Sequence, residues 1–188
     1  QRIDDSTLLA VGGKSLAALT QLDASVGDAY NSAGYWSALT IRGYTLDPRS
    51  NYRRDGLPIS AETAIALDNK AALELIKGIS GLQAGVSSPG GLVNFVVKRP
   101  IQNLLTARLE ARQGGSALAA LDMAQRFGAE QSLGLRINAA YEHLNPALRN
   151  AQGQRKLLSA AGEWRVNGST LLEAEAEWSE QRQRSQPG

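Results

Sequence analysis

Cysteine is absent from this chain of 188 residues, histidine occurs once and phenylalanine twice. The absence of cysteine excludes disulfide frameworks, thiol nucleophiles and thiolate metal sites, and a lone histidine, His143, argues against a metal site built from imidazoles. No apolar run approaches the roughly 18 residues that a membrane-spanning helix needs. The first residues lack the pattern of a signal peptide. Because the chain begins with Gln1, we expect it to be processed or cut from a longer one.

An excess of charge of one sign is also lacking. The 20 basic and 18 acidic side chains give a formal net charge of +2, and residues 1–100 and 101–188 each carry 10 basic and 9 acidic groups. A nucleic-acid-binding surface needs a concentration of basic groups, so this even distribution predicts no nucleic-acid partner. The length is sufficient for one domain, or for one domain and part of a second.

Patterns of catalytic or cofactor-binding residues are missing as well. The sequence has no Gly-x-Ser-x-Gly nucleophile motif and no phosphate-binding glycine loop followed by lysine. The glycine-rich stretch 85–91 leads into a predicted strand, so no helix dipole is available there for a phosphate. Asp4, Asp5 and Glu62 do not have the spacing of a metal site. We therefore predict that the chain is not an enzyme and holds no catalytic residue, metal or cofactor.

The first 99 residues mix short strands with helical segments. Leucines at helical spacing predict a short helix within residues 16–22, and residues 62–72 are predicted to form one or two helical turns. Short apolar runs that end in turns predict strands at 40–43, 73–78 and 92–97. This mixture indicates a small α+β unit.

After Pro100 the sequence alternates between apolar residues and charged or small residues. In the first segment Leu105 and Leu109 share one face, whereas Arg108 and Glu110 share the other. A period of two residues is typical of β-strands. Five such segments are predicted, at 104–112, 117–127, 133–144, 156–166 and 171–178.

The connections between these strands differ in length. Short turns are predicted at 128–131 and at Asn167-Gly168, a strong hairpin signal. The connections at 113–116 and 145–154 alternate with these turns, and the second of them is a longer loop. This arrangement matches a transmembrane β-barrel meander with an apolar outer face, and Trp164 and Trp178 near strand ends suit an interfacial aromatic girdle. A soluble antiparallel sheet with one wet face is the alternative.

The number of strands is too small for a closed barrel. Bacterial single-chain barrels have 8 strands or more, so the chain is expected to stop within a barrel. The predicted fold is an α+β domain followed by an antiparallel transmembrane β-barrel meander of about five strands, with the barrel incomplete.

Four motifs in the first hundred residues carry a family resemblance. They are Leu39-Thr40-Ile41-Arg42-Gly43-Tyr44, Asn51-Tyr52-Arg53-Arg54-Asp55-Gly56-Leu57-Pro58-Ile59, Leu73-Glu74-Leu75-Ile76-Lys77-Gly78 and Ser88-Pro89-Gly90-Gly91-Leu92-Val93-Asn94-Phe95-Val96-Val97-Lys98-Arg99-Pro100. In this order and spacing they resemble the plug domain of TonB-dependent outer-membrane receptors, in the ferric-siderophore branch. The resemblance implies a plug domain at residues 1–100 and the first strands of a truncated outer-membrane β-barrel at residues 101–188.

The resemblance also implies a function. Such a receptor lies among the lipids of the outer membrane of a Gram-negative bacterium, binds a ferric siderophore and imports it by energy coupling to a TonB-type protein. The apolar segment that recruits this partner is not evident in residues 1–10, so we expect it upstream or lost. Two alternatives stay open: a receptor of the same class for cobalamin or a carbohydrate, and a soluble ligand- or partner-binding module without transport.

Aromatic residues gather where the resemblance places the ligand. Four of the five tyrosines and one of the three tryptophans lie within residues 30–52, and such side chains suit a bulky, oxygen-rich ferric chelate. In the family, apical plug loops contact the ligand. The corresponding residues here are Tyr30, Tyr35, Trp36, Asp47, Arg49, Asn51, Glu62 and Thr63. Iron is expected only as the siderophore chelate, so the chain need not supply metal ligands.

Charged and glycine residues within the motifs are expected at the interface between plug and barrel. They are Arg42, Gly43, Arg53, Arg54, Asp55, Gly56, Glu74, Lys77, Gly78, Gly90, Gly91, Lys98 and Arg99. Their charges are expected to pair with lumen-facing Arg108, Glu110, Glu142, Glu173 and Glu175. Hydrated pairs worth about 0–1 kcal/mol each would hold the plug and still let it shift.

Overall fold

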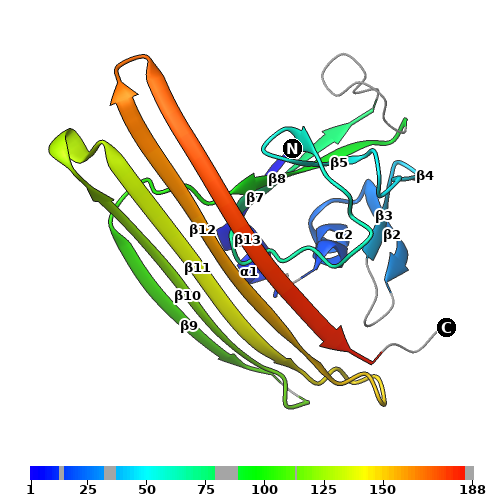
Figure 1. Cartoon of the computed structure of the whole chain (residues 1–188). Coiled ribbons are helices and arrows are strands. Elements are labelled where there is room, and N and C mark those ends of the chain that lie inside the picture. The colour runs from blue at the N-terminus through cyan, green and yellow to red at the C-terminus, as the bar shows by residue number, and fades with distance from the viewer. Residues whose placement is uncertain (13–14, 32–36, 79–88, 113, 185–188) are drawn as a thin grey trace. The chain divides into compact units, whose positions relative to one another are not determined.

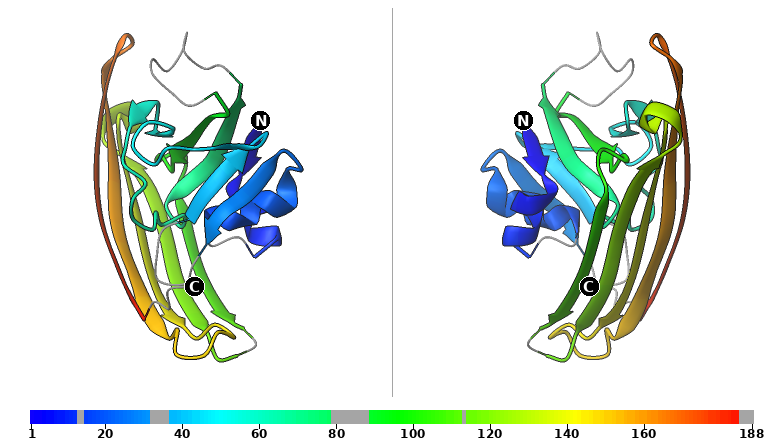
Figure 2. Two further views of the ribbon diagram at one scale, coloured as in Figure 1. Left: turned by 90° about the vertical axis from the view of Figure 1, so that its right-hand side faces the viewer. Right: turned by 90° about the vertical axis from the view of Figure 1, so that its left-hand side faces the viewer.

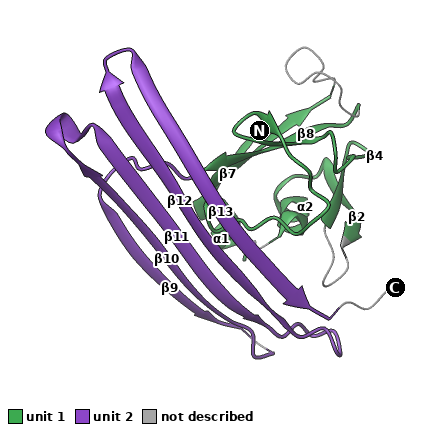
Figure 3. Cartoon of the chain, viewed as in Figure 1, with its two compact units in different colours: residues 1–97, 187–188 green, residues 98–186 purple. Residues whose placement is uncertain are grey.

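The chain divides into two compact units between Val97 and Lys98 (Figure 3). The structure is a computed structural model that describes residues 1–12, 15–31, 37–78, 89–112 and 114–184. The sequence predicted the division between residues 100 and 101. The segment Lys98–Pro100 therefore groups with the strands that follow it.

The described residues of the first unit form two small sheets and three short helical segments, whose arrangement Figure 1 shows. Its elements are β1 Arg2–Asp4, α1 Asp5–Ala10, the 3-10 helix η1 Leu16–Ala18, α2 Leu19–Leu22, β2 Val26–Asn31, β3 Ser37–Ile41, β4 Tyr44–Thr45, β5 Tyr52–Arg54, β6 Leu57–Pro58, β7 Lys70–Lys77 and β8 Gly91–Val97. One sheet has the order β1-β7-β8-β5-β6 and the other β2-β3-β4. Only the β5–β8 pair is parallel among the strand pairs of the described residues. The helices η1 and α2 lie against β2 and β3 (Figure 2).

Apolar side chains from both sheets and from the helices form one core. Leu39 and Ile41 of β3, Leu73 of β7 and Phe95 of β8 are completely buried. The Tyr52 ring stacks on that of Phe95, with 6.4 Å between the ring centroids. Residues two apart in a strand point to the same side, which explains why the alternating apolar positions of these short strands all reach the core.

The sequence located most of these elements. The predicted helix within 16–22 is confirmed by η1 and α2, and the predicted strands at 73–78 and 92–97 by β7 and β8. The prediction of helical turns at 62–72 is wrong, because residues 61–69 contain no helix and β7 begins at Lys70. Leu67 is buried in the core from an extended segment, so tertiary packing overrides the local helix propensity.

Two motif dipeptides form the same kind of hairpin turn. Arg42 and Gly43 connect β3 to β4 with φ of 51° and 83°, and Asp55 and Gly56 connect β5 to β6 with φ of 47° and 82°. A two-residue loop with positive φ at both positions is a type I′ turn, which matches the twist of antiparallel strands. The two dipeptides therefore set the register of these hairpins.

Backbone passes very close to backbone at Gly90 and Gly91, as the sequence predicted. A Cβ atom on Gly91 would lie 2.0 Å from the carbonyl oxygen of Ile76, and one on Gly90 would lie 2.9 Å from Tyr44 Cβ. The φ of Gly91 is 126°, a conformation that side chains with a Cβ oppose. Only glycine fits this approach of β8 to β7.

A short ion pair fixes the segment before β2 to the end of β7. The ammonium group of Lys77, whose Nζ lies 2.6 Å from Asp23 Oδ2, lowers the pKa of the Asp23 carboxyl group to about 2. The Asp23 side chain is 7% exposed. It also accepts hydrogen bonds from the backbone N–H and the hydroxyl group of Ser25.

We expect Asp23→Asn to lower the stability of the first unit by about 1 kcal/mol at pH 7. A lowered folded-state pKa means that the carboxylate stabilises the fold above about pH 4 and loses this contribution as the pH falls toward 2. Thermal unfolding of wild type and variant, followed by near-ultraviolet circular dichroism, should therefore differ at pH 7 and converge near pH 2. Asp28→Asn, at an exposed position, is the control, and an equal shift in both variants would contradict the prediction.

The second unit is a single antiparallel sheet. Its elements are β9 Leu104–Ala111, β10 Ala117–Phe127, the 3-10 turn η2 Ala129–Gln131, β11 Leu133–Leu144, β12 Gly153–Asn167 and β13 Thr170–Gln183. Each strand pairs with its neighbour in sequence, so the order is β9 to β13, and the long strands lie side by side in a curved layer (Figures 1 and 2). The predicted meander is confirmed. Strands β12 and β13 are longer than predicted, because their backbones continue to pair beyond the clear apolar alternation.

The two faces of this sheet differ in chemistry. The apolar face carries the large side chains Leu105, Leu109, Leu158, Trp164 and Trp178, which are between 50% and 84% exposed. The charged face carries the alternate residues of each strand, including Arg108, Glu110, Asp122, Arg136, Glu142 and Arg155. No helix in the described part of the chain is long and apolar enough to cross a membrane.

The hairpin predicted at Asn167-Gly168 exists, but its turn is shifted by one residue. Asn167 pairs with Thr170, which leaves Gly168 and Ser169 as the loop. Asn167 Oδ1 accepts hydrogen bonds from the Ser169 backbone N–H at 3.0 Å and from its hydroxyl group at 2.9 Å. An Asn side chain that caps the turn in this way favours the shifted register.

Candidate functional site

Three predicted ligand-contacting segments gather at one end of the β2-β3-β4 sheet. Tyr30 pairs with Ala38 across β2 and β3. The Leu46 backbone N–H donates a hydrogen bond to Leu39 O at 2.9 Å. The chain after Thr45 therefore continues beside β3 toward the end of the sheet where Tyr30 lies. The backbone N–H of Ala61 then donates to Pro48 O at 2.8 Å and brings the segment around Glu62 beside the Asp47 turn. These bonds place the segment around Glu62 beside the Asp47 turn and direct the chain toward the end of the sheet where Tyr30 lies.

Polar and aromatic side chains are exposed on this surface. Tyr30, Glu62 and Thr63 are exposed, and the Arg49 side chain is 75% exposed. Asp47 holds the turn, because its Oδ1 accepts a hydrogen bond from the Arg49 backbone N–H at 2.8 Å and lies 3.5 Å from Arg49 Nε. Such a surface can stack on a ring and exchange hydrogen bonds, and Arg49 is its one cation, beside the carboxylate of Asp47. We name Tyr30, Asp47, Arg49, Glu62 and Thr63 the candidate ligand face.

Two predicted ligand residues cannot be assigned to this face and a third does not belong to it. Tyr35 and Trp36 lie outside the described residues. Asn51 is completely buried, and its Oδ1 accepts from the Asp47 backbone N–H at 3.1 Å while its Nδ2 donates to Gly91 O at 2.5 Å. The prediction that Asn51 contacts a ligand is corrected accordingly, because its amide group joins the Asp47 turn to β8.

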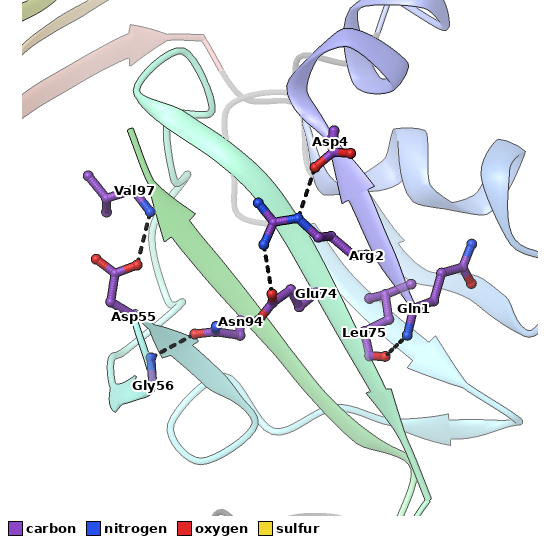
Figure 4. Close-up of polar contacts among 9 residues, drawn as sticks. All are labelled: Gln1, Arg2, Asp4, Asp55, Gly56, Glu74, Leu75, Asn94 and Val97. Atoms are coloured by element: carbon purple, nitrogen blue, oxygen red, sulfur yellow. Dashed lines mark hydrogen bonds and ion pairs between the residues drawn. The ribbon is translucent and has the colours of Figure 1, made fainter. Parts of the chain in front are cut away.

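Several motif residues form a polar network inside the first unit (Figure 4). Glu74 Oε1 lies 3.0 Å from Arg2 Nη1, and Glu74 Oε2 accepts a hydrogen bond from Asn94 Nδ2 at 2.9 Å. Asn94 Oδ1 in turn accepts from the Gly56 backbone N–H at 2.9 Å, and Asp55 Oδ1 accepts from the Val97 backbone N–H at 3.0 Å. The network joins β1, β7 and β8 to the Asp55-Gly56 turn.

Three of the motif charges have partners within the first unit. Glu74 pairs with Arg2, Lys77 pairs with Asp23, and the Arg53 guanidinium group donates to Ser50 O at 2.7 Å. All of these partners lie in the first unit. Sequence reasoning did not identify Arg2 or Asn94, since neither lies in an unusual pattern by itself. Arg42 and Gly43 form the exposed turn described above, and Gly78 donates its N–H to Gly90 O at 3.0 Å.

Lys98 and Arg99 do contact the strands of the second unit. Lys98 Nζ lies 3.2 Å from Asp122 Oδ2, and the Arg136 guanidinium group holds the same carboxylate through two bonds of 2.8 and 2.7 Å. Arg99 lies 3.6 Å from Glu173 and 3.8 Å from Glu175, as predicted for those two glutamates.

Further contacts hold the segment 98–103, which we name the connecting segment. Arg136 Nη1 donates to Arg99 O at 2.9 Å, and the Arg126 backbone N–H donates to Asn103 Oδ1 at 2.9 Å. Pro100 lies so close to Gly134 that a Cβ there would be 2.8 Å from Pro100 Cγ. The connecting segment is thus fixed on the charged face. The sequence predicted partners for Arg99 but not the contacts with Asp122, Arg136 and Gly134, because alternation alone gave these residues no partner.

The other predicted lumen residues pair with one another. Arg108 Nε lies 3.2 Å from Glu110, and Arg112 lies 3.2 Å from Glu110 and 2.9 Å from Glu142. Glu142 also forms an ion pair of 2.7 Å with Arg155. The two pairs of Glu142 cross between strands and stabilise the register of β9 to β12. Within the described residues no group of histidine, cysteine and acidic side chains could hold a metal ion.

Comparison with known proteins identifies the fold. No protein-family model matches the chain. It superposes on BauA, the ferric preacinetobactin receptor of Acinetobacter baumannii, with a TM-score of 0.84 and 22% identity, covering 95% of this chain and 27% of BauA. The chain has the fold of part of a siderophore receptor. For the outer-membrane ferripyoverdine receptor of Pseudomonas aeruginosa the TM-score is 0.83 and the identity 18%, covering 96% of this chain and 25% of that one. The predicted resemblance to TonB-dependent receptors, with an α+β plug and an incomplete barrel, is thus confirmed for the fold.

Curated relatives of this siderophore-receptor fold are also receptors. The metal-pseudopaline receptor CntO of Pseudomonas aeruginosa is 35% identical over 107 residues, which are 56% of this chain and 15% of CntO. The ferric-pyoverdine BN7/BN8 receptor of Pseudomonas putida is 30% identical over 126 residues, which are 62% of this chain and 13% of that receptor. The chain therefore spans about one seventh of these relatives. Their names agree with the prediction that the chain is not an enzyme.

Proposed function

We propose that this chain is part of an outer-membrane receptor that binds a ferric siderophore and imports it by energy coupling to a TonB-type partner. The observation that carries the proposal is the identity of 35% and 30% with two receptors for metal chelates, over stretches of 107 and 126 residues. The candidate ligand face supports it, because an exposed tyrosine, an arginine and hydroxyl groups suit an oxygen-rich chelate that stacks and accepts hydrogen bonds. The iron ion is cargo and arrives with its coordination already filled.

The chemistry of the sheet supports a membrane location over the soluble alternative. A soluble one-sided sheet packs its apolar face on a core and exposes its polar face. Here Leu105 is 72% and Leu109 84% exposed, and the opposite face carries the ion pairs. An apolar outer face with a polar lumen is the pattern of outer-membrane barrels.

The full-length protein is expected to bind a ferric siderophore and to lose affinity when Arg49 is removed. We expect ferric pyoverdine or a ferric catecholate to quench tryptophan fluorescence at sub-micromolar concentration, and Arg49→Ala to weaken binding about tenfold, the effect of one charge-assisted contact. Arg165→Ala, an exposed arginine beside the Gly168-Ser169 turn, is the matched control. Equal affinities for the two variants would contradict the assigned ligand face.

Transport requires a second readout in cells that express the full-length protein. Uptake of the iron-labelled chelate should stop on addition of a protonophore, whereas binding at the cell surface should persist. Binding of cobalamin or a carbohydrate in place of every ferric chelate would overturn the siderophore assignment. A detergent-free, monodisperse protein that still binds its ligand would overturn the membrane assignment.

A further inference from the structure

Asn51 ends the Asp47 turn, residues 47–51, and is completely buried, whereas the side chain of Arg49 in the same turn is 75% exposed. The amide group of Asn51 makes hydrogen bonds in two directions. Its Oδ1 accepts from the Asp47 backbone N–H at 3.1 Å, and its Nδ2 donates to Gly91 O at 2.5 Å. A buried amide bonded at both ends cannot rotate without leaving a polar group unpaired. Asn51 therefore fixes the Asp47 backbone relative to β8.

The main chain attaches the Asp47 turn to the same strand. Asn51 O accepts a hydrogen bond from the Val93 backbone N–H at 2.9 Å, two residues along β8 from Gly91. On the other side of the turn, Pro48 O accepts from the Ala61 backbone N–H at 2.8 Å. Because β8 is an inner strand that pairs with β7 on one side and β5 on the other, the turn is anchored to the interior of a sheet.

Every backbone N–H group of the Asp47 turn is hydrogen-bonded. Besides that of Asp47 itself, the N–H of Arg49 donates to Asp47 Oδ1 at 2.8 Å. The N–H groups of Ser50 and Asn51 donate to Asp47 O at 3.2 and 3.0 Å. Pro48 has no N–H group, and its ring restricts φ. The turn therefore has little conformational freedom as long as Asn51 keeps its place.

The Asp47 carboxylate connects Asn51 to Arg49. Its Oδ1 binds the Arg49 backbone N–H and also lies 3.5 Å from Arg49 Nε. A side chain that is ordered before the ligand arrives loses less conformational freedom on binding, which raises affinity. The turn thus supplies orientation more than net charge, since the carboxylate of Asp47 offsets the charge of the guanidinium group.

We propose that Asn51 is a positioning residue, whose buried amide group holds the Asp47 turn so that Arg49 donates hydrogen bonds to an oxygen-rich ferric chelate. The inference rests on the proposed function, because Arg49 is a ligand contact only if the candidate ligand face binds the chelate. Asn51 itself does not touch the ligand. It raises the affinity by keeping the binding conformation of the turn populated in the free protein.

The first test is chelate binding by the full-length protein, measured by quenching of tryptophan fluorescence with the chelate that wild type binds, ferric pyoverdine or a ferric catecholate. A serine side chain is too short to reach both partners of the asparagine. We expect Asn51→Ser to bind about fivefold more weakly, because the apparent dissociation constant rises as the binding conformation becomes less populated.

Asn94→Ser is the matched control. It makes the same change in the same sheet, where the half-buried amide group of Asn94 joins β7 to the Asp55-Gly56 turn, and it should leave the affinity unchanged. Equal affinities for the Asn51 and Asn94 variants would overturn the proposal.

A double-mutant cycle shows whether Asn51 acts through Arg49. Arg49→Ala alone is expected to weaken binding about tenfold. Asn51→Ser should add nothing to this loss, so the double variant should also bind about tenfold more weakly than wild type. Independent effects would multiply to a loss of about 50-fold. A loss of that size would show that Asn51 affects binding by another route, and it would overturn the positioning role.

Hydrogen–deuterium exchange of residues 47–51 tests the turn without any ligand. These amides should be protected in the free wild-type protein and should exchange about tenfold faster in Asn51→Ser, but not in Asn94→Ser. Rapid exchange in free wild type would refute a preformed turn, and this measurement needs no variant to fold.

The same measurements separate this inference from the proposed function. A protein that binds a ferric chelate equally well with Asn51 and with serine in its place would overturn the positioning role alone. If wild type binds no ferric chelate, and its turn is protected only when Asn51 is present, the siderophore assignment is overturned and the role of Asn51 in fixing the turn is supported.

Discussion

Replacing Gly91 with alanine is expected to prevent the plug from folding. The new Cβ would lie 2.0 Å from the carbonyl oxygen of Ile76 and 3.0 Å from Lys77 Cα. Both are backbone atoms of β7 in the middle of the sheet, so no side-chain movement relieves the clash. The φ of 126° at Gly91 adds strain for any residue with a Cβ. We expect a loss of more than about 3 kcal/mol, which is a large part of the 5–15 kcal/mol that stabilises a typical domain.

The measurement is the near-ultraviolet circular dichroism of the plug aromatics in the full-length protein, together with limited proteolysis of residues 1–97. Gly168→Ala is the matched control, because no atom lies within 4 Å of its added Cβ and its φ is not positive. The control should behave as wild type. If Gly91→Ala kept the wild-type melting temperature and protease resistance, the close approach of β8 to β7 would be refuted.

Local sequence patterns predicted the elements whose residues repeat regularly. The bounds of β10 and β11 agree with the prediction, because eleven or more residues of alternation specify a strand strongly. The Asp55-Gly56 dipeptide predicted its turn because few residue pairs accept positive φ at both positions. Short elements such as β1 and β5 were missed, since three residues carry no period and form only by pairing with β7 and β8.

The candidate site was predicted only in part, because local motifs locate a segment but do not show which of its side chains are exposed. The motifs directed attention to residues 47–51, but they could not separate Arg49, whose side chain is 75% exposed, from Asn51, which is buried. That difference depends on the contact of Asn51 with Gly91, 40 residues away.

Neutralising Asp122 is expected to release the connecting segment from the charged face. Asp122 accepts from Lys98 and from two nitrogen atoms of Arg136, and the three side chains are only 11–16% exposed. Asp122→Asn keeps the shape of the side chain but leaves two cations near each other without their anion. Removal of one partner from a buried ion pair costs about 3 kcal/mol or more. Arg136 also holds Arg99 O, so its displacement loosens the backbone of the connecting segment as well.

Hydrogen–deuterium exchange of residues 98–103 in the full-length protein measures this release directly. About 3 kcal/mol corresponds to exchange roughly 100-fold faster at the amides of the connecting segment, while residues 133–144 at the centre of the sheet should change far less. Glu180→Gln makes the same carboxylate-to-amide change in the exposed pair with Arg182, whose side chain is 73% exposed, and should cost at most about 0.5 kcal/mol. Exchange in the connecting segment that matches this control would show that Pro100 and Arg126, rather than the ion cluster, hold this segment on the charged face of the sheet. If the exchange rises as expected, Asp122 is the side chain that fixes the connecting segment on the second unit.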